Sequence, residues 1–195
     1  MKKILTIAIS MMIAFTTINA AQEAVESLKF KTINGKEIEI IGTEKGFDIP
    51  QYKGKVVFVE FWGTHCPPCL ISIPHYIELQ EKYKDNLAIL AVEVQNKPLE
   101  GLKEFAKVKG MNYDVVSYKD GLTFVEYIAQ RAGWSGSIPF LVILDTKGEV
   151  QIVQPGLIPV EQLENVIKEM SGLSKVVDNN TSTKSTTTEQ NSTKK

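Results

Sequence analysis

The feature that most constrains this chain is a Cys-x-x-Cys pair placed directly behind a run of apolar residues. Residues 56–61 are continuously apolar except for one acid, which predicts a central strand covered on both faces. The only two cysteines, Cys66 and Cys69, follow after a short turn, where a helical pattern begins. At the N-terminus of a helix, unpaired N–H groups and the helix dipole favour a thiolate, which is the reactive form. The pattern therefore predicts a reactive dithiol at a strand-to-helix junction.

Metal binding and a structural cross-link are the alternatives to redox chemistry. A c-type haem site needs His after the second cysteine, where this chain has Leu70. A zinc site needs four ligands, and His65 and His75 are the nearby candidates. His75 lies about 240° around the helix from Cys69, so it points elsewhere. A structural disulfide that closes so short a loop contributes little stability. The spacing favours a redox disulfide, with no metal and no further cofactor.

Residues 1–20 have the layout of a secretory signal peptide. Lys2 and Lys3 precede an apolar run over 4–15, and Ala20 offers a small residue for cleavage. That run is shorter than the ~20 residues a spanning helix needs. We expect a soluble periplasmic protein, in a compartment where disulfides persist. Residues 21–27 would then form a linker.

The remaining chain divides into one domain and a tail. Without residues 1–20 the net charge changes from −1 to −3, and no basic cluster suggests a nucleic-acid partner. Residues 28–172 suffice for a single domain with its own core, which we expect to be monomeric. Residues 173–195 are rich in Ser, Thr, Asn and Lys, so a disordered tail is expected there.

Within the domain, strand and helix patterns alternate. Residues 28–41 alternate around Asn34-Gly35, which predicts an N-terminal β-hairpin with a two-residue turn. Further strands are expected at 56–61, 87–94, 113–118, 138–144 and 150–153, and helices at 67–84, 98–109, 122–132 and 160–170. This order, closed by a second hairpin, indicates an α/β domain with a mixed central sheet.

On these motifs, the chain resembles the thioredoxin superfamily, and within it the exported TlpA/ResA-type reductases associated with cytochrome c maturation. The likeness covers 28–172 and rests on Phe-Trp-Gly-Thr-His-Cys-Pro-Pro-Cys at 61–69, Pro74, the lead-in at 52–57 and Ser-Ile-Pro-Phe at 137–140. It implies a thioredoxin-like fold, with a helix-strand insertion between 94 and 138. The chain departs from the family at His65, often Trp there, and at Ser72, an acid in ResA-type members.

The resemblance and the chemistry of thiols together suggest a role for four residues. Cys66 would attack a substrate disulfide, and Cys69 would resolve the mixed disulfide, closing the Cys66–Cys69 bond. Glu60 matches the buried acid of thioredoxins, and burial would raise its pKa so that it exchanges a proton with Cys69. The alternative is a glutamate that tilts into solvent. Pro139 resembles the family's cis-proline, whose preceding residue, Ile138, offers backbone to a substrate chain.

Two further residues have open roles. Trp62 would either shape a docking surface beside the dithiol or fill the core. His65, if protonated, would favour the Cys66 thiolate; otherwise it is a solvent-facing turn residue. His75 is expected on the helix surface.

These expectations describe an exported dithiol reductase acting on protein disulfides. By resemblance, the heme-binding cysteines of apocytochrome c are the favoured substrate, and a membrane thiol electron-transfer partner would keep the dithiol reduced. A disulfide-donating oxidase is one alternative. A copper or zinc metallochaperone is another, since thiolates suit such metals, although two ligands make a poor site.

The tail carries two matches to the glycosylation rule Asn-x-Ser/Thr, at Asn180 and Asn191. Each has an acid two residues earlier, which resembles the longer acceptor pattern of bacterial periplasmic glycosylation. We predict added glycan mass on both sites in protein purified from its native host, measured by intact-mass spectrometry. An unmodified peptide covering 175–195 would contradict this prediction.

Overall fold

The computed structural model describes residues 27–173. The predicted signal peptide, the tail and the sites at Asn180 and Asn191 lie outside the described residues. The strands are β1 (Ser27–Lys31), β2 (Glu37–Gly42), β3 (Phe47–Asp48), β4 (Val56–Trp62), β5 (Leu87–Glu93), β6 (Asp114–Val116), β7 (Phe140–Leu144) and β8 (Val150–Pro155). The helices are α1 (Pro67–Lys82), α2 (Leu99–Lys109), α3 (Tyr118–Ala132) and α4 (Val160–Met170), with a 3-10 turn at Pro50–Tyr52.

A five-stranded mixed sheet forms the centre of the molecule, in the order β6-β5-β4-β7-β8. The central strand β4 runs parallel to β5 and antiparallel to β7. Strands β1, β2 and β3 form a separate antiparallel sheet. The predicted α/β class with a mixed central sheet is therefore confirmed.

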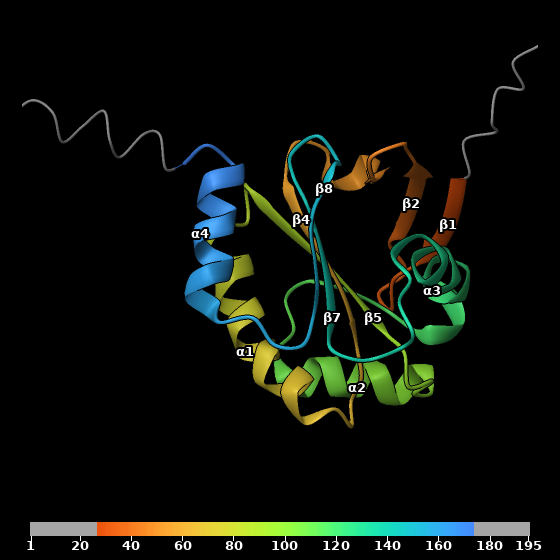
Figure 1. Cartoon of the computed structure of the whole chain (residues 1–195). Coiled ribbons are helices and arrows are strands. Elements are labelled where there is room, and N and C mark those ends of the chain that lie inside the picture. Colours follow the sequence, from red (N-terminus) through yellow and green to blue (C-terminus); the bar gives the residue numbers. More distant parts are fainter. Residues whose placement is uncertain (1–26, 174–195) are drawn as a thin grey trace, which may run out of the picture.

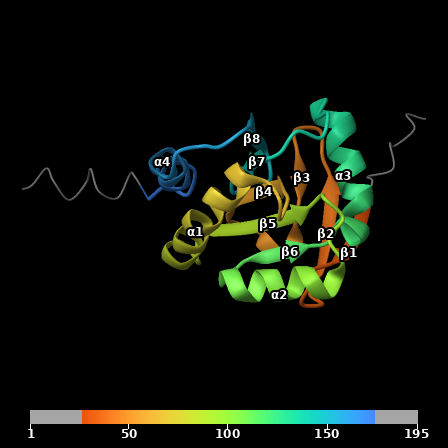
Figure 2. The ribbon, with the colours of Figure 1, turned by 90° about the horizontal axis from the view of Figure 1, so that it is seen from below.

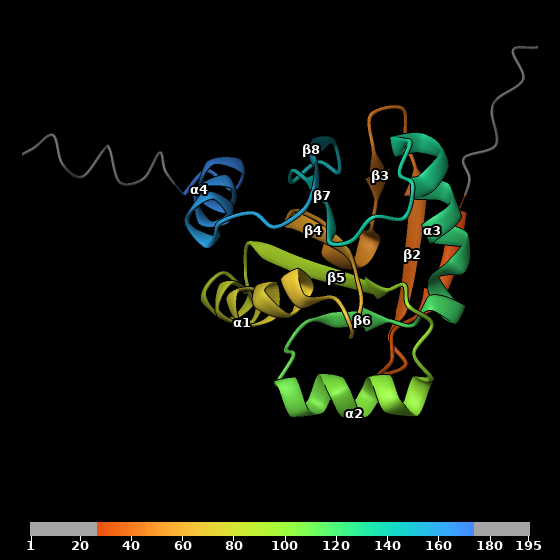
Figure 3. The same cartoon turned by 60° about the horizontal axis from the view of Figure 1, so that its bottom comes forward.

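The two faces of this sheet have different covers. Alternate residues of β4 point to opposite faces: Phe58 and Trp62 pack with α1, α2 and α4, whereas Val59 and Phe61 pack with α3 and the small sheet. Figure 1 shows α1 and α4 on one side and α3 with β1 and β2 on the other, and Figure 3 shows the same layers from another angle. Every residue of β4 is buried. The dithiol thus follows a strand that lies entirely inside the core.

The segment between β5 and β7 contains α2, β6 and α3 (Figure 2), of which α2 and β6 match the predicted helix-strand insertion. Helix α3 begins at Tyr118, four residues before the predicted start, because the Ser117 side chain caps it by accepting from Asp120 N at 3.2 Å. Gly121 weakens the helical pattern in the sequence. Glycine fits this position because a Cβ there would lie only 3.0 Å from Val92 Cγ1. Among residues 27–173, no helix is long and apolar enough to cross a membrane.

The N-terminal hairpin is present, but its predicted two-residue turn is wrong. Strand β1 begins at Ser27, inside the predicted linker, and the connection to β2 covers residues 32–36. The reason is a tertiary contact: Ile33 is buried, and its N–H donates to Val115 O on β6 at 2.8 Å. The turn is widened to cover the edge of the central sheet, where unpaired backbone groups would otherwise be exposed.

Candidate redox site

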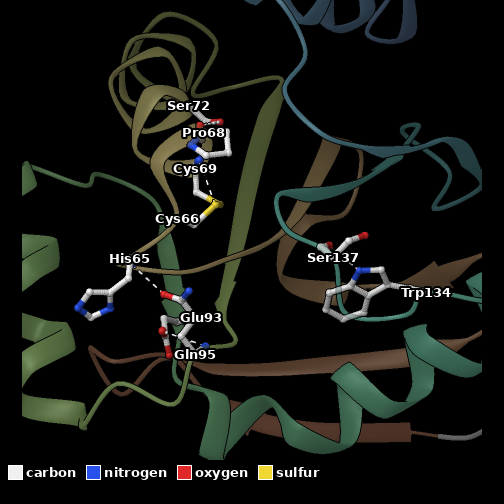
Figure 4. The surroundings of a disulfide bond; sticks show 9 residues. All are labelled: His65, Cys66, Pro68, Cys69, Ser72, Glu93, Gln95, Trp134 and Ser137. Atoms are coloured by element: carbon white, nitrogen blue, oxygen red, sulfur yellow. Dashed lines mark hydrogen bonds between the residues drawn. A yellow bond between two sulfur atoms is a disulfide. The ribbon is translucent and has the colours of Figure 1, made fainter.

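The turn between β4 and α1 presents the two cysteines (Figure 4). Cys66 is the N-cap of α1, and its N–H donates to Gly63 O at 3.3 Å. The prolines at positions 67 and 68 occupy the first helical turn, where a missing N–H costs little. Cys66 and Cys69 are joined by a disulfide with their Cα atoms 5.2 Å apart, and they are 4% and 0% exposed. The chain therefore holds both sulfurs at one helix end.

The sulfur of Cys66 has one backbone donor in the first turn of α1. An N-cap side chain normally accepts from the second and third helical positions. The second is Pro68, which has no N–H, and the third, Cys69 N, donates to Cys66 Sγ at 3.3 Å. A thiolate on Cys66 would thus receive less stabilisation from the helix than one with both donors.

Glu60 lies inside the core, so the solvent-facing alternative is wrong. It is 2% exposed and stands between Phe58 and Trp62 on the face of β4 that α1 covers. Burial raises the pKa of the Glu60 carboxyl to about 8, although hydrogen bonds with Tyr76 and Ser72 hold that pKa down in part. Its Oε1 atom has no hydrogen-bond partner. The carboxyl can therefore hold or release a proton near neutral pH.

Sequence reasoning missed the hydroxyl groups around Glu60. Tyr76 of α1 and Tyr113, before β6, meet edge to face with ring centroids 6.3 Å apart. Burial and the charge of Glu60 raise the pKa values of both tyrosines. Ser72 lies one helical turn beyond Cys69, where ResA-type members carry an acid. Here a neutral hydroxyl, not a second carboxyl, faces Glu60.

The predicted cis-proline is confirmed. The Ile138–Pro139 peptide bond is cis; Pro139 is buried and Ile138 is half-buried. The indole Nε1 of Trp134 donates to Ser137 O at 2.7 Å, and its ring stacks on Phe140 at 5.1 Å. Figure 4 shows this loop across from the disulfide. Trp134 is a supporting residue that the sequence analysis did not identify, although an indole near an X-Pro bond was visible in the sequence.

The remaining candidates differ in position. Trp62 is 1% exposed and packs 5.7 Å from the Phe105 ring, so the structure shows core filling and not a docking surface. His65 is exposed, but its imidazole points away from the disulfide in Figure 4, and its Nδ1 lies 3.1 Å from Thr64 Oγ1. It is not placed as a direct partner of Cys66 Sγ. His75 is half-buried on α1. Within residues 27–173, no three His, Cys, Asp or Glu side chains gather to hold a metal ion.

The burial of Glu60 predicts a pH-dependent stability. An unfolded glutamate has a pKa of ~4.3. Between that value and the folded value of about 8, the folded state binds more protons, so stability falls as pH rises, by ~1.4 kcal/mol per pH unit at most. Glu60→Gln removes this slope and stabilises the domain at pH 7 and above. Urea unfolding of the disulfide form at pH 5 to 8 measures it.

The matched control for this prediction is Glu78→Gln, on the exposed side of α1. It should keep the slope of the native protein. Equal pH dependence in the Glu60→Gln variant and the native protein would show that Glu60 does not hold its proton to near-neutral pH.

Comparison with known proteins places the chain in a family. Residues 26–153 match the model of the AhpC/TSA family. The thiol-disulfide oxidoreductases ResA of Geobacillus kaustophilus and Bacillus thuringiensis subsp. konkukian are 32% and 31% identical, over 60% and 65% of this chain. The matched segment spans 63% and 70% of those relatives. The crystal structure of StoA from Bacillus subtilis superposes with a TM-score of 0.55 at 23% identity, covering 72% of this chain and 95% of that one. The chain belongs to the thioredoxin-like AhpC/TSA family and is a relative of the ResA-type thiol-disulfide oxidoreductases.

Proposed function

We propose that this protein is an exported thiol-disulfide reductase that transfers electrons from the Cys66–Cys69 dithiol to protein disulfides. The observation that carries the proposal is the single first-turn donor to Cys66 Sγ, since Pro68 offers no N–H. A weakly stabilised thiolate makes the reduced form less favourable, so the disulfide is harder to reduce and the dithiol is a better reductant. The same observation disfavours the disulfide-donating oxidase. The metallochaperone alternative would have to rely on two protein thiolates.

The reaction is two successive thiol-disulfide exchanges. The Cys66 thiolate attacks one sulfur of the substrate disulfide, so that a mixed disulfide forms and the first substrate thiolate leaves and takes up a proton. The Cys69 thiolate then attacks Cys66 Sγ, which forms the Cys66–Cys69 bond and releases the second substrate thiolate, which in turn takes up a proton. Two electrons pass to the substrate, and the protein is left oxidised. The Cys66–Cys69 dithiol carries these two electrons, so the proposed reaction uses no further cofactor.

Glu60 is the group that we assign to the proton of Cys69. Cys69 is fully buried, so water does not reach its thiol directly. Glu60 lies on the same side of the sheet, and its Oε1 is free of hydrogen bonds. A carboxyl whose pKa is about 8 is partly ionised at neutral pH and can accept the Cys69 proton before resolution.

The relatives guide the choice of substrate and partner. Two of them are named ResA and are described as thiol-disulfide oxidoreductases. By resemblance, the heme-binding cysteines of apocytochrome c are the proposed substrate. A thiol-bearing membrane protein would return two electrons after each cycle. Export through residues 1–20 would place the protein in the periplasm, and Ile138 would offer its backbone to the substrate chain.

The redox potential tests the direction of electron flow. We expect a value nearer the ~−270 mV of thioredoxin than the ~−120 mV of the strongest periplasmic oxidant. Pro68→His adds an N–H, and in its protonated form a cation, near Cys66 Sγ, so its potential should be higher by tens of millivolts. Equilibration with glutathione at pH 7 measures both proteins. A native potential near the oxidant's value would overturn the reductase proposal.

Trapping identifies the substrate. In a Cys69→Ala variant the second exchange is impossible, so the mixed disulfide on Cys66 should accumulate. Mass spectrometry of complexes from the periplasm of the native host would name the bound proteins. A Cys66→Ala variant, which retains only the buried Cys69, is the matched control and should capture none. Complexes that lack c-type apocytochromes would contradict the proposed substrate while leaving the exchange chemistry intact.

A further inference from the structure

A buried carboxyl at the end of β5 organises the loop beside the dithiol. Glu93 is 0% exposed, and its two oxygens accept from the backbone N–H groups of Gln95 at 3.1 Å and Lys97 at 3.0 Å. A buried carboxyl is costly unless its oxygens are hydrogen-bonded, and both are satisfied here. Asn96, between the two donors, has φ of 59°, and it is the only residue other than glycine with positive φ among those described. Glu93 thus stabilises a sharply bent loop over residues 93–97.

This bend directs the side chain of Gln95 onto the turn that precedes Cys66 (Figure 4). Gln95 Oε1 accepts from His65 N at 2.8 Å. The same side chain fills the space beside Gly63, where a Cβ would lie 2.3 Å from Gln95 Cδ. Gly63 O in turn accepts from Cys66 N at 3.3 Å. Gln95 therefore contacts both Gly63 and His65, the two ends of the turn that positions the first cysteine.

We propose that Gln95, held in place by Glu93, is a positioning residue that stabilises the Cys66–Cys69 disulfide relative to the dithiol. This inference rests on the proposed redox function of the same site. It concerns the contacts of Gln95 with His65 and Gly63, which are separate from the contacts of the cis-proline loop.

Two physical effects of the contact act in the same direction. A fixed turn keeps Cys66 Sγ close to Cys69 Sγ, which raises the effective concentration of one thiol at the other and favours the closed bond. The hydrogen bond also occupies the N–H of His65, so this donor is not free to turn toward a Cys66 thiolate and stabilise the reduced form. Loss of Gln95 should therefore make the disulfide easier to reduce.

The test compares Gln95→Ala with the native protein in glutathione buffers at pH 7. The equilibrium is balanced: the protein disulfide and two glutathione thiols give the protein dithiol and one glutathione disulfide. We expect the Gln95→Ala equilibrium to favour the dithiol by about tenfold more, equivalent to ~30 mV for this two-electron couple.

Gln51→Ala is the matched control, because Gln51 Oε1 also accepts a backbone N–H, from Glu39 at 3.3 Å, away from the dithiol. It should leave the glutathione equilibrium unchanged. Urea unfolding of the two reduced variants should give similar midpoints, which would separate positioning from a general loss of stability.

Gly63→Ala provides an independent variant. Its Cβ would displace the Gln95 side chain, so the disulfide should again become easier to reduce, and the double variant should differ little from Gln95→Ala alone. An equilibrium constant for Gln95→Ala within about twofold of the Gln51→Ala value would overturn the inference. Because the test is a ratio between variants, a high native potential would refute the reductase proposal without affecting this result.

Discussion

The burial of β4 on both faces is the constraint on which the rest of this structure depends. A strand with no exposed residue must be covered by separate layers, here α1, α2 and α4 on one side and α3 with the small sheet on the other. After β4 the chain stays buried through Gly63 and Thr64, and His65 is the first exposed residue of the turn to α1. Both cysteines therefore lie at the edge of the core and are nearly inaccessible to water. In the first turn of α1, one backbone N–H, that of Cys69, donates to Cys66 Sγ. The position of the two cysteines thus follows from where β4 ends and α1 begins.

Much of the fold could be predicted because local patterns and tertiary packing agree. Strand β4, helix α4 and the Cys66 cap have apolar or capping signals that need no distant contact. The prediction of the hairpin turn was wrong because the local pattern and the tertiary packing disagree there. Asn34-Gly35 favours a two-residue turn, but the N–H of Ile33 donates a hydrogen bond to Val115 O on β6. The predicted start of α3 was wrong because Gly121 breaks the helical pattern, although the helix already begins at Tyr118 behind the Ser117 cap. Glycine is needed at position 121 because the backbone there passes close to Val92.

The residues of the candidate site could be predicted where they belong to a recognisable sequence motif. The two cysteines, Glu60 and Pro139 could be named from their spacing and from the family resemblance. Trp134 and Gln95 were not named, because each contacts a backbone group that no motif marks: Trp134 donates to Ser137 O, and Gln95 accepts from His65 N, thirty residues earlier. Glu93 did leave a signal: like Glu60, it is an acid that belongs to an otherwise apolar strand.

Glu60 and Glu93 show how two buried carboxyls of the same residue type can have different surroundings. Glu60 and Glu93 lie on neighbouring strands, and both side chains are almost wholly buried. Glu93 accepts from two backbone N–H groups, so its oxygens are committed to the shape of a loop. Glu60 keeps one oxygen without a partner, and burial raises its pKa toward the range in which thiols titrate. A buried acid saturated with donors can only hold structure, whereas one left partly unsatisfied can move a proton. The two carboxyls differ in how their hydrogen bonds are distributed: both oxygens of Glu93 accept a backbone N–H, whereas Oε1 of Glu60 accepts none.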